Sequence, residues 1–223
     1  MSGRDDILRR IRASLGSGDG EAGRAQAVAR RLKRHPRGII PDTGADTGAD
    51  TVARFVDKAR AAAATVETVR SANVGKAIVD FLRAHNLPQR LRAGADERLR
   101  RIAWPKGGEP EILAGASDGD DVTGLSHAFA GVGETGTLVL LSGADNPSTV
   151  NFLPENHIVI VDAADIAADY ETVWTRLRRR FGASKMPRTV NLVTGPSRSA
   201  DIEQTLIMGA HGPVRLHVIV VTG

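Results

Sequence analysis

The chain of 223 residues contains no cysteine, and only 4% of its residues are aromatic. Without a thiolate it can form neither a disulfide nor a zinc or iron–sulfur site with Cys ligands. No apolar run approaches the roughly 18 residues that cross a bilayer, and the amino terminus lacks the apolar core of a signal peptide. These absences predict a cytoplasmic protein without a membrane span, whose redox chemistry would depend on a partner or a borrowed cofactor.

Basic residues are concentrated near the amino terminus. Residues 1–37 contain ten Lys or Arg against four Asp or Glu, whereas the other 186 residues contain 20 against 22. A surface that binds nucleic acid combines positive charge with aromatic side chains on which bases stack. The body of the chain has neither feature, so we do not expect nucleic acid as a partner. A nucleic-acid arm at residues 4–37 remains an alternative, and its binding would collapse with salt.

Hydrophobic periodicity divides the chain into a helical segment, residues 1–41, and an α/β domain, residues 42–223. The first has sparse apolar residues at helical spacing and a basic surface, which predicts helices loosely attached to the rest. In the second, apolar strands alternate with helices, which predicts crossover connections and a mostly parallel sheet covered on both faces. Strands are expected at 65–69, 89–92, 111–113, 157–161, 189–193 and 214–221, with two more within 126–141, and helices at 50–64, 74–84, 166–181 and 199–208.

One short motif matches the dinucleotide-binding fingerprint letter for letter: Gly131-Val132-Gly133-Glu134-Thr135-Gly136. In that fold the glycines open a helix whose amino terminus faces the pyrophosphate. Here the next five residues, Thr-Leu-Val-Leu-Leu, are typical of a buried strand. We therefore do not expect a dinucleotide at this motif.

Four ordered segments carry polar residues in or beside glycine- and proline-containing turns: residues 133–137 (GETGT), 151–157 (NFLPENH), 195–203 (GPSRSADIE) and 209–213 (GAHGP). Together they resemble the lactate utilisation protein C family, which is built on the LUD domain. The resemblance covers about the last hundred residues closely, although Gly133 stands where alanine is more usual.

This resemblance implies a fold similar to that of ribose-5-phosphate isomerase, glucosamine-6-phosphate deaminase and the CoA transferases. It also implies a role in the oxidation of L-lactate to pyruvate beside two partner proteins, at least one of which carries iron–sulfur clusters. Because this chain has no cysteine, we expect the clusters on the partners and no cofactor bound by the chain itself. The chain is expected to bind a small carboxylate or a partner protein.

The segment Gly195–Glu203 lies between a predicted strand and a predicted helix. Backbone N–H groups at a helix start, together with Arg198 and the hydroxyls of Ser197 and Ser199, would hold a carboxylate or phosphate. The turn itself would be shaped by Gly195-Pro196. Alternatively, Ser199 only caps the helix while Arg198 pairs with an acid of its first turn.

Glu134 lies in a sharp turn bounded by Gly133 and Gly136, with Thr135 and Thr137 as candidate substrate-binding hydroxyls. A carboxylate beside a buried strand can have a raised pKa and act as a base or nucleophile. Similarity to the CoA transferases implies such a nucleophile, and the alternative function is a free-standing isomerase or CoA-transferase-like enzyme. The structural alternative is a carboxylate that accepts N–H bonds and rigidifies the turn.

Two histidines are candidates for proton transfer, because an imidazole titrates near neutral pH. His211 lies in a turn with Gly212 and Pro213, and is the better candidate, whereas His157 begins a strand and can simply bond a carbonyl. Both are expected near the carboxyl edge of the sheet, where α/β sites form, and Asn151 is expected to line the same cleft. No His has metal-ligand spacing to an acid, so we expect no metal.

Overall fold

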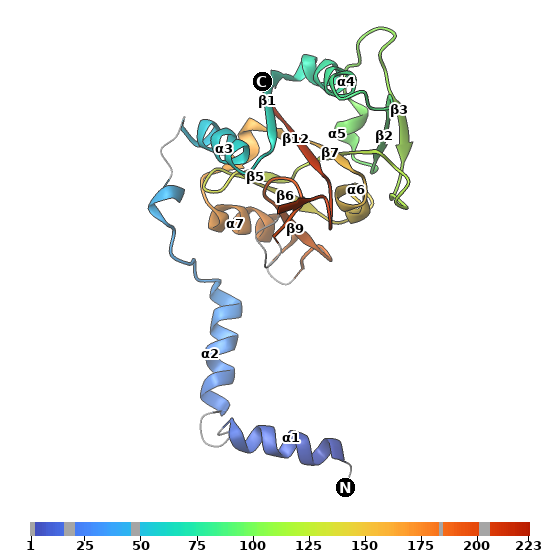
Figure 1. Ribbon diagram of the computed structural model, residues 1–223. Coiled ribbons are helices and arrows are strands. Elements are labelled where there is room, and N and C mark those ends of the chain that lie inside the picture. Colours follow the sequence, from blue (N-terminus) through green and yellow to red (C-terminus); the bar gives the residue numbers. More distant parts are fainter. Residues whose placement is uncertain (1–2, 16–20, 46–49, 183–184, 201–205) are drawn as a thin grey trace. The chain divides into compact units, whose positions relative to one another are not determined.

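The computed structural model describes residues 3–15, 21–45, 50–182, 185–200 and 206–223 (Figure 1). The chain divides into two compact units, residues 1–39 and 40–223. The first contains α1 (Gly3–Ser14) and α2 (Glu21–Arg34), and α1 buries none of its residues. In the described part of the chain, no helix combines the length and apolar character needed to cross a membrane.

The second unit contains all the described strands and five α-helices. The strands are β1 (Thr65–Arg70), β2 (Arg90–Ala93), β3 (Glu111–Ala114), β4 (Thr123–His127), β5 (Ala130–Val132), β6 (Thr137–Leu141), β7 (Asn156–Asp162), β8 (Ile166–Ala167), β9 (Val190–Val193), β10 (Arg198–Ala200), β11 (Leu206–Met208) and β12 (Arg215–Thr222). The helices are α3 (Asp50–Ala61), α4 (Val74–Ala84), α5 (Glu97–Arg100), α6 (Ser148–Phe152) and α7 (Tyr170–Phe181), with 3-10 turns η1 (Asp42–Gly44), η2 (Ser71–Asn73) and η3 (Ala163–Asp165).

Six strands form one parallel sheet in the order β1-β12-β7-β4-β2-β3. The central strand β7 reads as a continuous apolar run because both of its faces are buried. Val159 and Val161 enter one core cluster, whereas Ile158 and Ile160 enter another. The predicted α/β class with a mostly parallel sheet is therefore confirmed.

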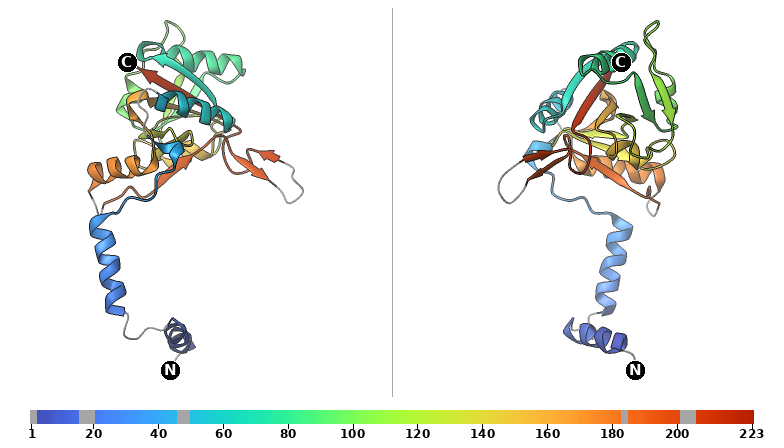
Figure 2. Two further views of the ribbon diagram at one scale, coloured as in Figure 1. Left: turned by 90° about the vertical axis from the view of Figure 1, so that its left-hand side faces the viewer. Right: turned by 45° about the vertical axis from the view of Figure 1, so that its right-hand side comes forward.

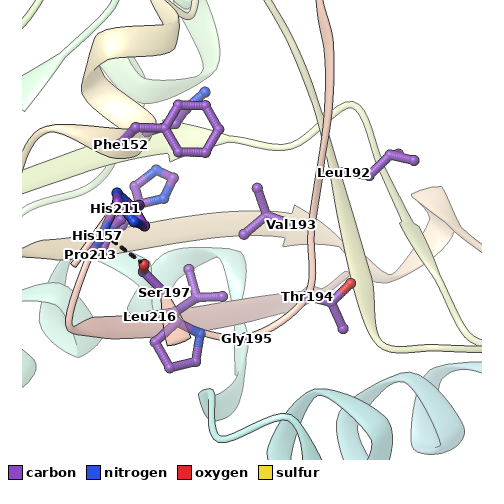
Figure 3. A pocket seen from close by; sticks show the side chains of 13 residues that line it. Phe152, His157, Leu192, Val193, Thr194, Gly195, Ser197, His211, Pro213 and Leu216 are labelled. Carbon is purple, nitrogen blue, oxygen red and sulfur yellow. Dashed lines mark hydrogen bonds between the residues drawn. The ribbon is translucent and has the colours of Figure 1, made fainter. Parts of the chain in front are cut away.

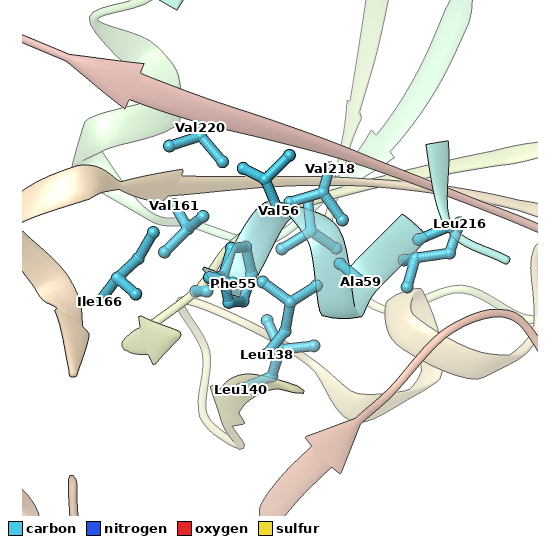
Figure 4. Packing of buried hydrophobic residues seen from close by; sticks show 13 residues of the cluster. Phe55, Val56, Ala59, Leu138, Leu140, Val161, Ile166, Leu216, Val218 and Val220 are labelled. Atoms are coloured by element: carbon cyan, nitrogen blue, oxygen red, sulfur yellow. The ribbon is translucent and has the colours of Figure 1, made fainter. Parts of the chain in front are cut away.

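Different elements pack on the two faces of this sheet. Helix α4, apolar at positions three and four apart, packs on one face. Helix α3 and a second sheet, β8-β5-β6-β9, pack on the other, where Phe55 meets Leu138, Leu140 and Val218 (Figure 4). Helix α7 covers the far side of the second sheet. The second sheet is mixed, because β6 runs antiparallel to both β5 and β9 whereas β8 runs parallel to β5.

Helix α7 begins at Tyr170 rather than at the predicted Ile166. The Asp169 side chain accepts the Thr172 N–H at 2.8 Å, which caps the helix. The residues before this cap, Ile166–Ala167, pair with β5 as the short strand β8. Because strand pairing buries both residues, tertiary contacts override the helical pattern.

The predicted helix at 199–208 is wrong at both of its described ends, whereas residues 201–205 lie outside the described part of the chain. Arg198–Ala200 and Leu206–Met208 form an antiparallel hairpin, β10–β11, which projects from the two sheets (Figure 2). Its base is closed by backbone bonds from Ser197 N to Pro213 O and from Gly209 N to Ser197 O, both 2.9 Å long. These long-range bonds occupy backbone groups that a helix start would have left free.

The turn Gly133–Gly136 connects the antiparallel strands β5 and β6. Gly136 has a φ of +69°, and the residues after it extend as a strand. The dinucleotide fingerprint therefore lacks the strand-to-helix context that its chemistry requires, as predicted.

Candidate functional site

A cavity of about 220 Å³ lies among α6, β9 and the starts of β7 and β12. Phe152, His157 and His211 lie on one side and Val193 and Thr194 on the other (Figure 3). The remaining lining residues are Asn151, Leu192, Gly195, Pro196, Ser197, Gly212, Pro213 and Leu216. This wall is largely apolar, with a few polar groups, which is the usual composition of a small-molecule site.

The cavity unites three of the four sequence motifs. Asn151 and His157 come from the second motif, Ser197 from the third and His211 from the fourth. Ser197 Oγ accepts the His211 backbone N–H at 3.3 Å, and Ser197 N donates to Pro213 O. The two turns are thus bonded to each other, so the third and fourth motifs form one wall.

The cavity lies at the amino ends of the parallel strands, not at the carboxyl edge that we expected. His157 is the second residue of β7, and His211 precedes β12. The expectation failed because each histidine lies at or just before the start of its strand, whereas the carboxyl edge of the sheet is formed by the strand ends. The short helix α6, in a segment expected to be a loop, brings Asn151 to this end of the sheet.

Two of the lining side chains, Asn151 and His157, form a buried hydrogen-bonded chain with Ser126. Ser126 Oγ donates to Asn151 Oδ1 at 2.8 Å, and His157 Nε2 lies 3.0 Å from Ser126 Oγ. Because the single hydroxyl proton goes to the amide oxygen, the His157 contact requires an Nε2–H donor. His157 is therefore in the tautomer whose Nδ1 is an unprotonated acceptor.

Two polar atoms at this chain have no hydrogen-bond partner among the described residues: His157 Nδ1, an acceptor, and Asn151 Nδ2, a donor. Both side chains are at most 1% exposed. Complete burial lowers the pKa of His157 to about 3, so its ring stays neutral near pH 7. A buried donor and a buried acceptor left unpaired are costly, and both residues line the cavity.

Thr135 and Thr137 lie behind the cavity wall. Thr137 Oγ1 is 2.6 Å from Thr135 Oγ1, 2.8 Å from the Tyr170 hydroxyl and 2.6 Å from Thr194 Oγ1. Of these residues only Thr194 lines the cavity. The two predicted threonines therefore support the wall through Thr194.

Glu134 and Arg198 are not among the lining residues. The half-buried Glu134 carboxylate lies against Gly44, so that a methyl group on that glycine would come within 3.0 Å of Oε2. Arg198 is exposed and donates to the Ala62 carbonyl oxygen at 2.9 Å. Position 199 is in strand β10 rather than at the start of a helix, and the Asp201–Glu203 part of the predicted anion loop lies outside the described residues.

No group of three His, Asp or Glu side chains within the described ranges is placed to hold a metal. The absence of a bound metal or cofactor stays a prediction.

Sequence reasoning missed Ser126, Phe152 and Thr194. Ser126 lies in the buried strand β4, whose sequence is TGLSH, and nothing local distinguishes its hydroxyl from that of any other strand residue. It acts through residues 25 and 31 positions away. The pairing of β4 with β7 brings His157 to Ser126, and the packing of α6 against β4 brings Asn151 there.

Comparison with known proteins gives a family model, the LUD domain, that matches residues 52–221. Lactate utilization protein C of Geobacillus sp. strain WCH70 is 33% identical over 134 residues, covering 56% of each chain. The Bacillus subtilis protein of the same name is 32% identical over 128 residues, covering 53% of each. The chain thus spans about half the length of these curated relatives.

Among solved structures, a DUF162 family protein from Deinococcus radiodurans matches with a TM-score of 0.58 and 21% identity, over 78% of this chain and 98% of that one. That likeness supports the fold. The family model covers most of the α/β unit, and the resemblance inferred from the four motifs is confirmed. The chain belongs to the LUD-domain family.

Proposed function

We propose that the protein takes part in lactate utilisation and that the cavity bounded by Asn151, His157 and His211 binds a small 2-hydroxycarboxylate, L-lactate in the first instance. The observation that carries the ligand proposal is the buried pair of unpartnered atoms, His157 Nδ1 and Asn151 Nδ2. The names of the curated relatives support the pathway.

A hydroxyl group meets both needs of this pair. It donates its proton to His157 Nδ1 and accepts a hydrogen bond from Asn151 Nδ2. The carboxylate then accepts a bond from the exposed ring of His211, and the methyl group packs on the apolar wall near Val193. A cavity of about 220 Å³ is below the roughly 300–1,000 Å³ of drug-sized sites and suits a metabolite of this size.

Oxidation of lactate to pyruvate releases two electrons and two protons. The chain has no cysteine for iron–sulfur ligation, so we place the electron acceptors on iron–sulfur partner proteins. With a pKa of about 3, His157 is too weak a base to take the hydroxyl proton near pH 7. In this chain its role is to hold the hydroxyl oxygen in a fixed orientation.

The ligand proposal predicts that Asn151→Asp weakens L-lactate binding at least tenfold. The carboxylate oxygen that replaces Nδ2 cannot donate to the ligand, whereas Oδ1 still accepts from Ser126. Loss of such a bond is worth about 1.4 kcal/mol, or a factor of ten. Calorimetric titration of the purified full chain measures the dissociation constant. Propionate, which lacks only the hydroxyl, is expected to bind at least tenfold more weakly than L-lactate.

Ser148→Ala is the matched control, because Ser148 is in the same helix, is half-buried and does not line the cavity. Equal affinities of the two variants, or of lactate and propionate, would overturn the ligand proposal. Thermal unfolding of each variant shows whether it is folded.

The pathway is tested separately by deleting the gene in a host with no second lactate oxidase. Loss of growth on L-lactate, with growth on glucose retained, is the expected result. Unimpaired growth on L-lactate would overturn the role in lactate utilisation whatever the titrations show.

A further inference from the structure

A second cavity, also about 220 Å³, lies at the opposite end of the parallel sheet. Its floor is formed where β4 ends at His127 and β7 ends at Asp162. Arg98 and Arg101 line one side, and Ser71 with the start of α4 lines another. Along β7, Asp162 is five residues beyond His157, about 16 Å at strand spacing. The two cavities therefore do not share a wall at this strand.

His127 presents an unprotonated nitrogen to this cavity. The ring is only 7% exposed, and Nδ1 lies 3.0 Å from the Ala128 carbonyl oxygen. A carbonyl only accepts, so Nδ1 carries the proton and Nε2 has a free lone pair. Burial, assisted by the positive charge of Arg98, lowers the pKa of His127, which keeps the ring in this neutral form.

The free Nε2 faces a second acceptor. It lies 3.5 Å from Asp162 Oδ2, and with neutral His127 there is no proton between the two atoms. That separation exceeds an N–H···O bond, so the pair is not bonded in its neutral state. A donor group on a ligand, such as a hydroxyl, is the simplest partner for both atoms.

Arg98 and Arg101 differ in how far their N–H donors are already bonded within the protein. Arg98 bonds the Asp96 carboxylate through Nε and Nη2 and reaches the Ala128 carbonyl oxygen through Nη1, so three of its five N–H donors are occupied. Arg101 is exposed and, among the residues that the structure describes, has no ion-pair partner. Its planar guanidinium suits a carboxylate or phosphate. The start of α4, where Asn73 makes no side-chain cap bond, adds positive potential.

We propose that this cavity is a second ligand site, which binds a small hydroxylated oxyanion: Arg101 holds the carboxylate or phosphate, and His127 with Asp162 accepts from a hydroxyl. The site is at the carboxyl ends of adjacent parallel strands, where ligands of open α/β sheets usually bind. It is distinct from the cavity at Asn151, His157 and His211, and this proposal does not depend on lactate binding there.

The test titrates the purified full chain with glycerate and with glycerol 3-phosphate, while the ring nitrogens of His127 are followed by NMR. Binding of either probe, with a shift of Nε2, is expected, and the tighter probe identifies the anionic group. Arg101→Gln should weaken that binding at least tenfold. Asp162→Asn, which replaces an acceptor by a donor, should weaken it similarly. Both residues are at least partly exposed, so the variants are expected to fold.

Arg100→Gln is the matched control, since Arg100 is the neighbouring arginine, pairs with Glu97 and does not line the cavity. Asn151→Asp separates the two proposals, because it should weaken lactate binding and leave this second binding unchanged. Absence of binding by both probes at millimolar concentration would overturn the proposal. Equal affinities of Arg100→Gln and Arg101→Gln would overturn it as well.

Discussion

Replacing Gly195 by alanine is expected to lower the free energy of unfolding by about 2–5 kcal/mol. Gly195 has a φ of +75°, and a Cβ atom there would lie 2.0 Å from the Ala62 carbonyl oxygen. The left-handed conformation costs a residue with a Cβ about 1–2 kcal/mol. Relief of the backbone clash adds about 1–3 kcal/mol, because the segment after α3 or the cavity wall must move. Urea unfolding followed by circular dichroism measures the difference.

Gly107→Ala separates these two costs. Gly107 has a φ of +66°, and nothing lies within 4 Å of a Cβ atom at this position. Only the conformational cost of about 1–2 kcal/mol applies. If both variants lose the same stability, the close approach of Gly195 to Ala62 contributes nothing, and the account of this turn is wrong.

Lowering the pH from 7 to 5 is expected to destabilise the protein by about 4 kcal/mol through His157 and His217. Burial lowers their pKa values to about 3 and about 4, with the charge of His85 adding to the effect on His217. Both folded-state values lie below the unfolded value of about 6.5. Between pH 6.5 and 4 the unfolded chain therefore binds protons that the folded chain does not, so stability falls as the pH falls. Each histidine contributes about 2 kcal/mol at pH 5.

Urea unfolding across pH 5 to 7 measures this slope. His157→Gln should reduce the loss of stability between pH 7 and pH 5 by about 2 kcal/mol, whatever its effect on stability at pH 7. His211→Gln, which changes an exposed ring, is the matched control. Burial raises the pKa values of Asp96 and Asp121, but their bonds to Arg98 and Arg92 outweigh it and lower them. The two carboxylates therefore lose their contribution to the free energy of unfolding only below about pH 4. A slope in His157→Gln equal to that in His211→Gln would contradict the assignment.

Local sequence pattern was enough to predict most of the central architecture. The apolar run at 157–161 appears as β7, and the helical spacing of Val74, Ile78 and Phe81 appears as α4. These segments bury the faces that their periodicities define, so local preference and tertiary packing agree. The four motifs also identified the family, because they lie in turns whose backbone is constrained by glycine and proline.

Where local conformational preference and tertiary packing disagree, the prediction from the sequence alone was wrong. The segment 199–208 has a helical composition, but its ends pair as β10 and β11 and its base is bonded to the turn at Pro213. Glu134 has the residue type and the turn of a catalytic carboxylate, yet its side chain lies against Gly44. Gly44 lies 90 residues before Glu134 in the chain, so no local pattern could reveal that contact.

Both candidate sites were assembled by strand register. In β4, Gly124 pairs with His157 and His127 pairs with Ile160, which sets Ser126 beside the His157 ring and His127 beside Asp162. Composition, periodicity and motifs established the α/β class and the family. They also singled out the three motifs that the fold brings together at one cavity. The tertiary structure alone decided which end of the sheet each polar side chain occupies, because a parallel register is set by contacts between residues far apart in the chain.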